Sequence, residues 1–382
     1  TDFWFNHFNI SFTKGESAQF IPAFERDAIR PNTTGKFSTL LLATAKSPAM
    51  LYYLDNFTSV GQPISNVKKP APVLPAGDAM SAIQMVPEPP KPQGNRAGLN
   101  ENYAREVMEL HTLGVDGGYT QNDVTEAARI LTGWTIYPIS NSGSGSSMKA
   151  LVARIGEQNL VQRGFIRDGD FLYTPTRHDN GEKVVLGKKF PQNGGYDEGI
   201  ALLEMLAAHP STSKFISRKL AVRFVSDEPP ATLITKLSRT FTEQKGDIKQ
   251  VLITMVNSPE FWSRNAMRQK TKSPFEFTIS AVRSLNADIK DPYQLFNWMS
   301  RMGQRIFYYQ APTGFPDKAQ YWINTGSLLN RMNFGLALSA QQIPGIKLNL
   351  LALNKNHEPE SANAALISYS KLIMPERDLD QT

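Results

Sequence analysis

Apolar residues recur at helical spacing over residues 100–113 and again over residues 121–134. Gly114 follows the first of these segments and is suited to end a helix. Before the second segment, Thr120 stands three residues ahead of Asp123, a spacing typical of a capping box. The pattern therefore predicts two consecutive helices joined by a tight turn.

Similar helical spacing covers most of the remaining chain. The further helices are expected at 17–29, 36–55, 198–208, 212–225, 231–244, 247–262, 291–302 and 326–339. Alternation typical of strands is confined to 165–190, where Asn180-Gly181 is a good hairpin turn. We expect a mainly α fold, a compact multi-helix domain with a small β-hairpin insertion and long Pro/Gly-rich loops.

The chain divides unevenly by composition. Residues 1–342 are expected to form a single mainly helical domain, with a loop and β-hairpin insertion at 138–190. Residues 56–97 are rich in Pro, Gly, Ala and Ser and form a Pro-rich excursion, either mobile or a lid that leads into the 100–113 helix. Residues 343–382 are expected to be a weakly ordered C-terminal helix and tail.

The polar residues of the 100–113 helix separate into two groups on a helical wheel. Glu101, Arg105 and Glu109 lie opposite the apolar stripe, whereas Glu106 lies within it. A carboxylate in an apolar face must be paired or protonated, and such carboxyls also serve in acid/base catalysis. Glu106 is therefore a catalytic candidate with Arg105 or a remote Arg as its partner, or else a structural tie between helices through an Arg or backbone amides.

Other polar residues are candidates by their surroundings. Asn100 and His111 lie at the other edge of the apolar arc and are candidate substrate-binding residues. His7 stands among aromatic residues, where a packed imidazole is the usual outcome and a catalytic base the alternative. His178-Asp179 precedes the expected hairpin turn, as a base with its orienting acid or simply as a turn former.

A late loop is dense in aromatic residues. It contains the sequence FYYQAPTGFPDKAQYWI, from which we select Tyr309 and Trp322 as candidate substrate-binding residues. Such rings can line a sugar groove, or they can anchor the loop to the core, which is the interpretation we favour.

Arg218, Lys219 and Arg223 form a basic side on the 212–225 helix. A solvated face is the default for such a group, and an Arg partner for Glu106 is the alternative.

Composition excludes several classes of function. The chain has 382 residues, 41% of them hydrophobic, so it can bury a large core. There is no Cys, which excludes disulfides and thiolate chemistry. The 41 basic and 35 acidic residues leave a net charge of only +6 without a basic block, so no nucleic acid is expected. No apolar run is long enough to predict a membrane span.

No cofactor or metal is expected either. Phosphate-loop, dinucleotide-binding, nucleophile-elbow and haem-attachment motifs are all missing from the sequence. The five His residues show no pair at metal-ligand spacing on one helix.

Several segments together carry a family resemblance. They read FWFNHFN at 3–9, NENYAREVMELHTLGVDGGYT at 100–120, DVTEAARILTGW at 123–134, RHDNGEKVVLGK at 177–188, HPSTSKFISRKL at 209–220, KSPFEF at 272–277 and PTGFPDKAQYWINTGSLLNRMNF at 312–334. In this order they resemble the domain of unknown function 1800 family of exported bacterial proteins. The resemblance implies a secreted or periplasmic location, a signal peptide and a further helical region before the first segment, and a family pattern that accepts Phe at the position of His111.

Two functional hypotheses follow. The first is an exported hydrolase or lyase that acts on a polysaccharide or cell-envelope polymer, with Glu106 as acid or base. The second is a non-catalytic envelope binding or assembly protein, for which the family resemblance implies an exported sulfatase-like partner. We expect convergence of Glu106, His7 and His178 in one pocket to favour the enzyme, and a buried Arg against Glu106 to favour the assembly protein.

Overall fold

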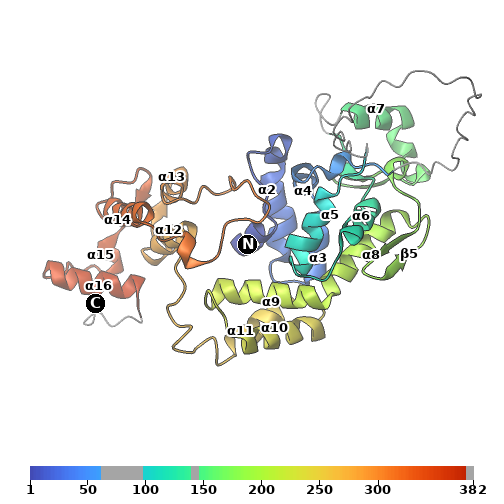
Figure 1. The fold of residues 1–382 in the computed structure, drawn as a ribbon. Coiled ribbons are helices and arrows are strands. Elements are labelled where there is room, and N and C mark those ends of the chain that lie inside the picture. The colour runs from blue at the N-terminus through green and yellow to red at the C-terminus, as the bar shows by residue number, and fades with distance from the viewer. Residues whose placement is uncertain (62–97, 139–145, 376–382) are drawn as a thin grey trace, which may run out of the picture.

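The computed structural model describes residues 1–61, 98–138 and 146–375 (Figure 1). Helices make up most of this part of the chain, and the strands form only small antiparallel sheets. The predicted mainly α fold is therefore confirmed.

The first half of the chain contains short helices, most of which pack around the largest hydrophobic core. They are α1 (Asp2–His7), η1 (Gly15–Phe20), α2 (Ile21–Ala23), η2 (Phe24–Ile29), η3 (Arg30–Asn32), α3 (Phe37–Lys46), α4 (Pro48–Tyr53), η4 (Asn56–Thr58), α5 (Asn102–Glu106), η5 (Val107–Leu113), α6 (Gln121–Ile130), α7 (Ser146–Ile155), η7 (Glu157–Asn159), η8 (Val161–Arg163) and η9 (Pro175–Arg177).

The second half has longer helices. They are α8 (Gly195–Ala208), α9 (Pro210–Phe224), α10 (Ala231–Glu243), α11 (Ile248–Val256), α12 (Pro274–Ser284), α13 (Tyr293–Arg301), η10 (Ala319–Tyr321), α14 (Thr325–Ser339), α15 (Leu350–Leu353) and α16 (Ala362–Ile373).

Local sequence signals set several of these boundaries. Thr120 and Asp123 form the predicted capping box at the start of α6, because each side chain accepts a hydrogen bond from the backbone of the other. Ser273 and Glu276 form a second capping box at α12, with Pro274 in the first turn. The helix expected over 36–55 breaks at Ser47, since a residue before Pro avoids the helical conformation.

The central helix differs from a regular α-helix. After Glu106 it continues to Leu113 as a π-helix, η5. The second helix ends at Ile130 instead of Trp134, because Trp134 begins strand β1. π-helical turns are rare in proteins, and where they occur they often lie at functional sites. The central helix therefore remains a candidate location for a functional site.

The strands are short and antiparallel. β1 (Trp134–Ile136), β3 (Phe171–Tyr173) and β2 (Ile166–Asp168) form one sheet in that order. β4 (Lys183–Val185) pairs with β5 (Lys188–Phe190), and β6 (Asp288–Ile289) with β7 (Ile346–Lys347).

The hairpin turn lies elsewhere than expected. Leu186 and Gly187 connect β4 to β5, and both have a positive φ, of 50° and 77°. Two left-handed residues match the right-handed twist of the paired strands. The prediction of a turn at Asn180-Gly181 was wrong, because the backbone N–H of Gly181 instead donates to the Asp179 carboxylate before the hairpin begins.

Three hydrophobic clusters hold the described chain together. The largest joins α1 to the helices from α3 to α6 and from α8 to α11, and a small one packs α7 against β3. A further cluster packs α12, α13 and α14 around Phe334 and includes Ile343, Ile346 and Leu348. In Figure 1 the helices α12 to α16 gather at one end of the molecule, away from α3 to α8. The division into 1–342 and 343–382 stays a prediction.

Most of the predicted Pro-rich excursion, from residue 62 to 97, lies outside the described residues. Its ends are described, and they meet: the backbone N–H of Val60 donates to the carbonyl of Gly98 at 2.6 Å. Among the residues that the structure describes, no helix is both long and apolar enough to span a membrane.

Candidate functional site

Glu106 is the only member of the predicted catalytic group whose carboxylate lacks a partner. It is half-buried at the end of α5, and burial raises its pKa, as does Glu109, while Arg105 opposes the shift. No hydrogen bond or ion pair joins its carboxylate to another residue in the described part of the chain. Arg105 instead donates to Gln121 at 2.7 Å and lies 3.8 Å from Glu101.

Replacement of Glu106 by Gln is expected to leave the free energy of unfolding within about 0.5 kcal/mol of wild type at neutral pH, or to raise it. The raised pKa means that folding disfavours the ionised carboxyl, so stability is lost as the pH rises through the folded-state pKa, and Gln removes this loss. Denaturant unfolding measures the effect, with Glu109→Gln as the matched control expected to lose about 0.5 kcal/mol. A loss of about 3 kcal/mol at Glu106 would instead reveal a buried ionic partner.

Three cationic or titratable side chains meet where α1, η5 and α9 touch. The Nζ of Lys219 donates to Nδ1 of His7 at 3.0 Å, and Nε2 of His7 donates to the carbonyl of His111 at 3.1 Å. Both imidazoles are buried, and their ring centroids are 6.2 Å apart. The structure thus brings together His7 and His111 with a lysine that the sequence analysis had placed on a basic helix face.

Burial keeps both imidazoles of this cluster uncharged at neutral pH and weakens the charge of the lysine beside them. It lowers the pKa of His7 well below its usual value and that of His111 to about 3, and the charge of Lys219 adds to both shifts. Burial also lowers the pKa of Lys219 to about 8, against a smaller opposing effect of Asp317. Lys219 therefore loses its proton near physiological pH, which an exposed lysine does not do.

Lys219 lies at the wall of a groove of about 470 Å³. One side of this groove is α9, and the other is the loop that contains Tyr309, Phe315 and Tyr321. We call it the α9 groove. Its lining residues are Phe215, Arg218, Lys219, Val222, Tyr309, Thr313, Gly314, Phe315, Pro316, Asp317, Lys318 and Tyr321.

The N-terminal segment holds the loop of the α9 groove in place. The Asn6 amide donates to the Phe315 carbonyl and accepts from its N–H, both at 2.7 Å, and Asn9 donates to the carbonyls of Tyr309 and Ala311. Gly314 has a φ of +71°, and a Cβ there would lie 2.2 Å from the backbone oxygen of Asn6. Only glycine fits this close approach.

Two predicted substrate-binding residues have structural contacts. Trp322 is 5% exposed and donates through its indole N–H to the Pro316 carbonyl at 3.0 Å, so it anchors the aromatic loop to the protein interior. Asn100 donates to the Asp55 carbonyl at 2.9 Å and accepts from the N–H of Asn102, which fixes the start of α5. Tyr309, in contrast, lines the α9 groove and packs on Phe315 at 4.6 Å between centroids.

His178 and Asp179 belong to a different cluster of charges. Nε2 of His178 lies 2.7 Å from Oε1 of Glu198, and the ammonium of Lys183 lies 2.5 Å from the same oxygen. Lys183 also donates to the Asp179 carbonyl, and the Asp179 carboxylate accepts two hydrogen bonds from Arg129. Burial opposes ionisation of Asp179, but the hydrogen bonds from Arg129 and Gly181 and the charges of Arg129 and Lys183 together outweigh it and lower the pKa of Asp179. Neither predicted residue lines the α9 groove, and their catalytic roles stay predictions.

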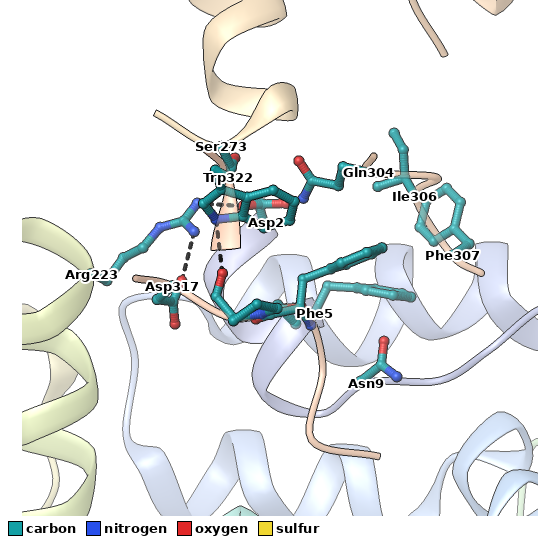
Figure 2. Close-up of a pocket in the computed structure, with 13 residues that line it drawn as sticks. Asp2, Phe5, Asn9, Arg223, Ser273, Gln304, Ile306, Phe307, Asp317 and Trp322 are labelled. Atoms are coloured by element: carbon teal, nitrogen blue, oxygen red, sulfur yellow. Dashed lines mark hydrogen bonds and ion pairs between the residues drawn. The ribbon is translucent and has the colours of Figure 1, made fainter. Parts of the chain in front are cut away.

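A small cavity lies beside the α9 groove (Figure 2). It has a volume of about 20 Å³ and is lined by Asp2, Asn9, Arg223, Asp317 and Trp322, among others. This is room for a water molecule and too little for a substrate. Figure 2 shows Arg223 reaching from α9 to Asp317, so the carboxylate that faces both spaces is already paired.

Metal binding finds no support in the described residues, among which no group of three or more His, Asp or Glu side chains is placed to hold an ion. Sequence reasoning did not select Lys219 or Arg218 as candidate site residues, although both line the α9 groove. The available signal was the basic side of the 212–225 helix, which contains both.

The fold and groove define a mainly α protein with an amine-containing groove between α9 and an aromatic loop. The sequence model of the family described as "Protein of unknown function (DUF1800)" matches residues 1–379, so the chain belongs to that family. This confirms the resemblance seen in the sequence. No curated protein and no solved structure matches the chain.

Proposed function

We propose that the protein is an enzyme that cleaves a polymer, as a hydrolase or lyase, in the α9 groove. One observation carries the proposal: Lys219, whose pKa burial lowers to about 8, lines a groove of substrate size beside aromatic rings. A lysine that is neutral near the working pH is suited to act as a general base. A secreted or periplasmic location, from the family resemblance, is part of this proposal.

The hydrogen bond to His7 suits this role. His7 is neutral and accepts from Lys219 through Nδ1, since its Nε2 donates to the His111 carbonyl. A neutral Lys219 amine can keep this hydrogen bond and still offer its lone pair to a substrate. Glu106 does not line the groove, so the proposal assigns the base to Lys219 instead of the carboxylate expected from the sequence.

Replacement of Lys219 by Met is expected to reduce polymer cleavage at least about 100-fold, the usual contribution of a general base. It should also raise stability at neutral pH, because it removes a buried ammonium. The measurements are release of reducing ends from a panel of polysaccharides and cell-wall polymers, and thermal unfolding. Lys249→Met, an exposed substitution on α11, is the control and should change neither.

The pH dependence gives a second measurement. The base acts in its neutral form, so kcat/KM should rise with pH and level off above about 8. Stability should also rise between about pH 8 and the unfolded-state pKa of about 10.4, because over that range only the unfolded chain keeps this proton. The proposal would be contradicted if Lys219→Met kept wild-type activity, or if the wild-type protein cleaved no polymer of the panel.

A second function, envelope assembly, is favoured by a different observation. Leu328, Leu329, Met332 and Leu336 form one apolar face of α14, and each is 46% to 67% exposed. Exposed apolar faces of this kind mark binding sites. The occupant implied by the family resemblance is an exported sulfatase-like protein. The test is co-elution of this purified partner with the purified chain, and its loss in Leu329→Asp.

A further inference from the structure

A second, larger groove adjoins the α9 groove at Arg218. The second groove has a volume of about 850 Å³, lies between α9 and α10, and includes Lys214, Arg218 and Arg239 in its lining. Arg218 lines both grooves, so they meet at this residue. A chain longer than one sugar can therefore lie along α9 and pass Arg218.

Cations outnumber acids along these joined grooves. The lining contains Lys214, Arg218, Lys219, Arg239 and Lys318 against only Asp317 and Glu243. Both acids are already paired, Asp317 with Arg223 at 2.8 Å and Glu243 with Arg239 at 2.7 Å. The joined grooves therefore favour an anionic occupant.

Two of the cations form no hydrogen bond or ion pair within the described residues, although the charge of Arg218 contributes to lowering the pKa of the exposed Glu228. Lys214 and Arg218 are exposed, one helical turn apart on α9, and neither makes a hydrogen bond or ion pair with any residue in the described ranges 1–61, 98–138 and 146–375. Their charges are thus available to a ligand. Arg suits this purpose because its planar guanidinium can bind a carboxylate through two parallel hydrogen bonds.

The opposite wall suits a sugar. Tyr309, Phe315 and Tyr321 present rings along the loop, and Tyr321 is 56% exposed. Aromatic faces pack against the apolar faces of sugar rings, while the hydroxyls remain near polar groups. A charged groove with an aromatic wall therefore fits an acidic polysaccharide better than an acidic peptide.

The residues that line the α9 groove also indicate which type of bond cleavage they can catalyse. Hydrolysis of a glycosidic bond usually needs two carboxyl groups that face the bond. The only carboxylate among the residues that line the α9 groove is Asp317, which Arg223 holds. An amine base next to a cation suits proton abstraction beside a carboxylate instead.

We infer that the substrate is a polysaccharide of uronic acids and that the reaction is β-elimination, an inference that rests on the proposed function. Arg218 binds the carboxylate at C5, which makes the C5 hydrogen more acidic. Lys219 takes this proton, the C5–H electron pair forms the C4=C5 double bond, and the C4–O bond breaks. Tyr309 protonates the departing oxygen. The products are an unsaturated uronate and a new chain end, and no water is consumed.

The experiment compares polygalacturonate, alginate and hyaluronate with neutral xylan and with a sulfated polymer that has no carboxylate. The unsaturated product absorbs ultraviolet light, whereas reducing ends report any cleavage. We expect a uronate polymer to give one ultraviolet-absorbing end for each new reducing end, and the other polymers to give neither. Reducing ends without the absorbance would overturn the elimination and leave the proposed function standing. No cleavage of any polymer would overturn both.

Variants separate the binding group from the proton donor. Arg218→Met is expected to raise KM for the uronate polymer about tenfold or more, and Arg218→Lys to restore part of the loss. Tyr309→Phe should lower kcat and leave KM nearly unchanged. Arg154→Met on α7, an exposed substitution outside both grooves, should leave both constants unchanged. Wild-type KM in Arg218→Met would contradict the assigned carboxylate site.

Discussion

Replacement of Glu198 by Ala is expected to lower the free energy of unfolding by about 3 to 5 kcal/mol. Its carboxylate lies 2.5 Å from the ammonium of Lys183 and 2.7 Å from Nε2 of His178, and all three side chains are at most 2% exposed. Removal of the carboxylate leaves buried cationic or donor groups without their acceptor. The loss exceeds what the missing methylenes cost, because unpaired buried charge is the larger penalty.

Urea unfolding of Glu198→Ala and of Glu204→Ala measures this difference. Glu204 lies on the same helix, α8, but is exposed, so its replacement should change stability by no more than about 0.5 kcal/mol. The double variant Lys183→Met/Glu198→Met should recover much of the loss, because an apolar pair replaces an ion pair at similar volume. Equal effects at Glu198 and Glu204 would show that the buried cluster contributes nothing to stability.

Sequence signals of short range predicted the local structure well. The capping box at Thr120 depends on two residues only three positions apart, and it formed as expected. The hairpin turn was harder, since Asn180-Gly181 and Leu186-Gly187 compete and only strand pairing decides between them. The helix α7 was missed, because the Ser/Gly-rich composition of the stretch before it is typical of a loop.

The candidate site depends on contacts between distant residues, which one sequence does not reveal. His7 and Lys219 are 212 positions apart and form one hydrogen bond, and Asn6 holds a loop 309 positions away. The helical wheel marked Glu106 as unusual, and the structure places it half-buried without an Arg partner. The sequence could not reveal that His178 lies 2.7 Å from Glu198, because that contact forms only when the segment after η9 packs against α8.

Arg223 joins three distant parts of the chain. Its guanidinium lies 2.5 Å from Asp2 on α1, 3.1 Å from Glu276 on α12 and 2.8 Å from Asp317 in the aromatic loop. One cation thus serves three carboxylates at the contact between the N-terminal helix and the segments that follow α11. All three ion pairs of this cluster therefore depend on Arg223.

Replacement of Arg223 by Met is expected to cost about 3 kcal/mol or more at neutral pH, because it leaves three neighbouring carboxylates without their cation. Arg239→Met is the matched control, since it breaks only an exposed pair with Glu243 and should cost less than about 0.5 kcal/mol. Thermal and urea unfolding of both variants give the comparison. A loss below 1 kcal/mol at Arg223 would mean that water satisfies the three carboxylates equally well.

The cost of Arg223→Met should also shrink as the pH falls. Burial raises the pKa of Asp2, against the opposing effect of Arg223, and the variant loses that opposition. A carboxyl with a raised folded-state pKa destabilises the protein in its ionised form, so stability is lost as the pH rises through that pKa and regained on acidification. Unfolding curves at neutral pH and near pH 4 should therefore show a smaller difference between variant and wild type at the lower pH. A difference that stays constant would assign the loss to packing of the Arg223 side chain instead of charge.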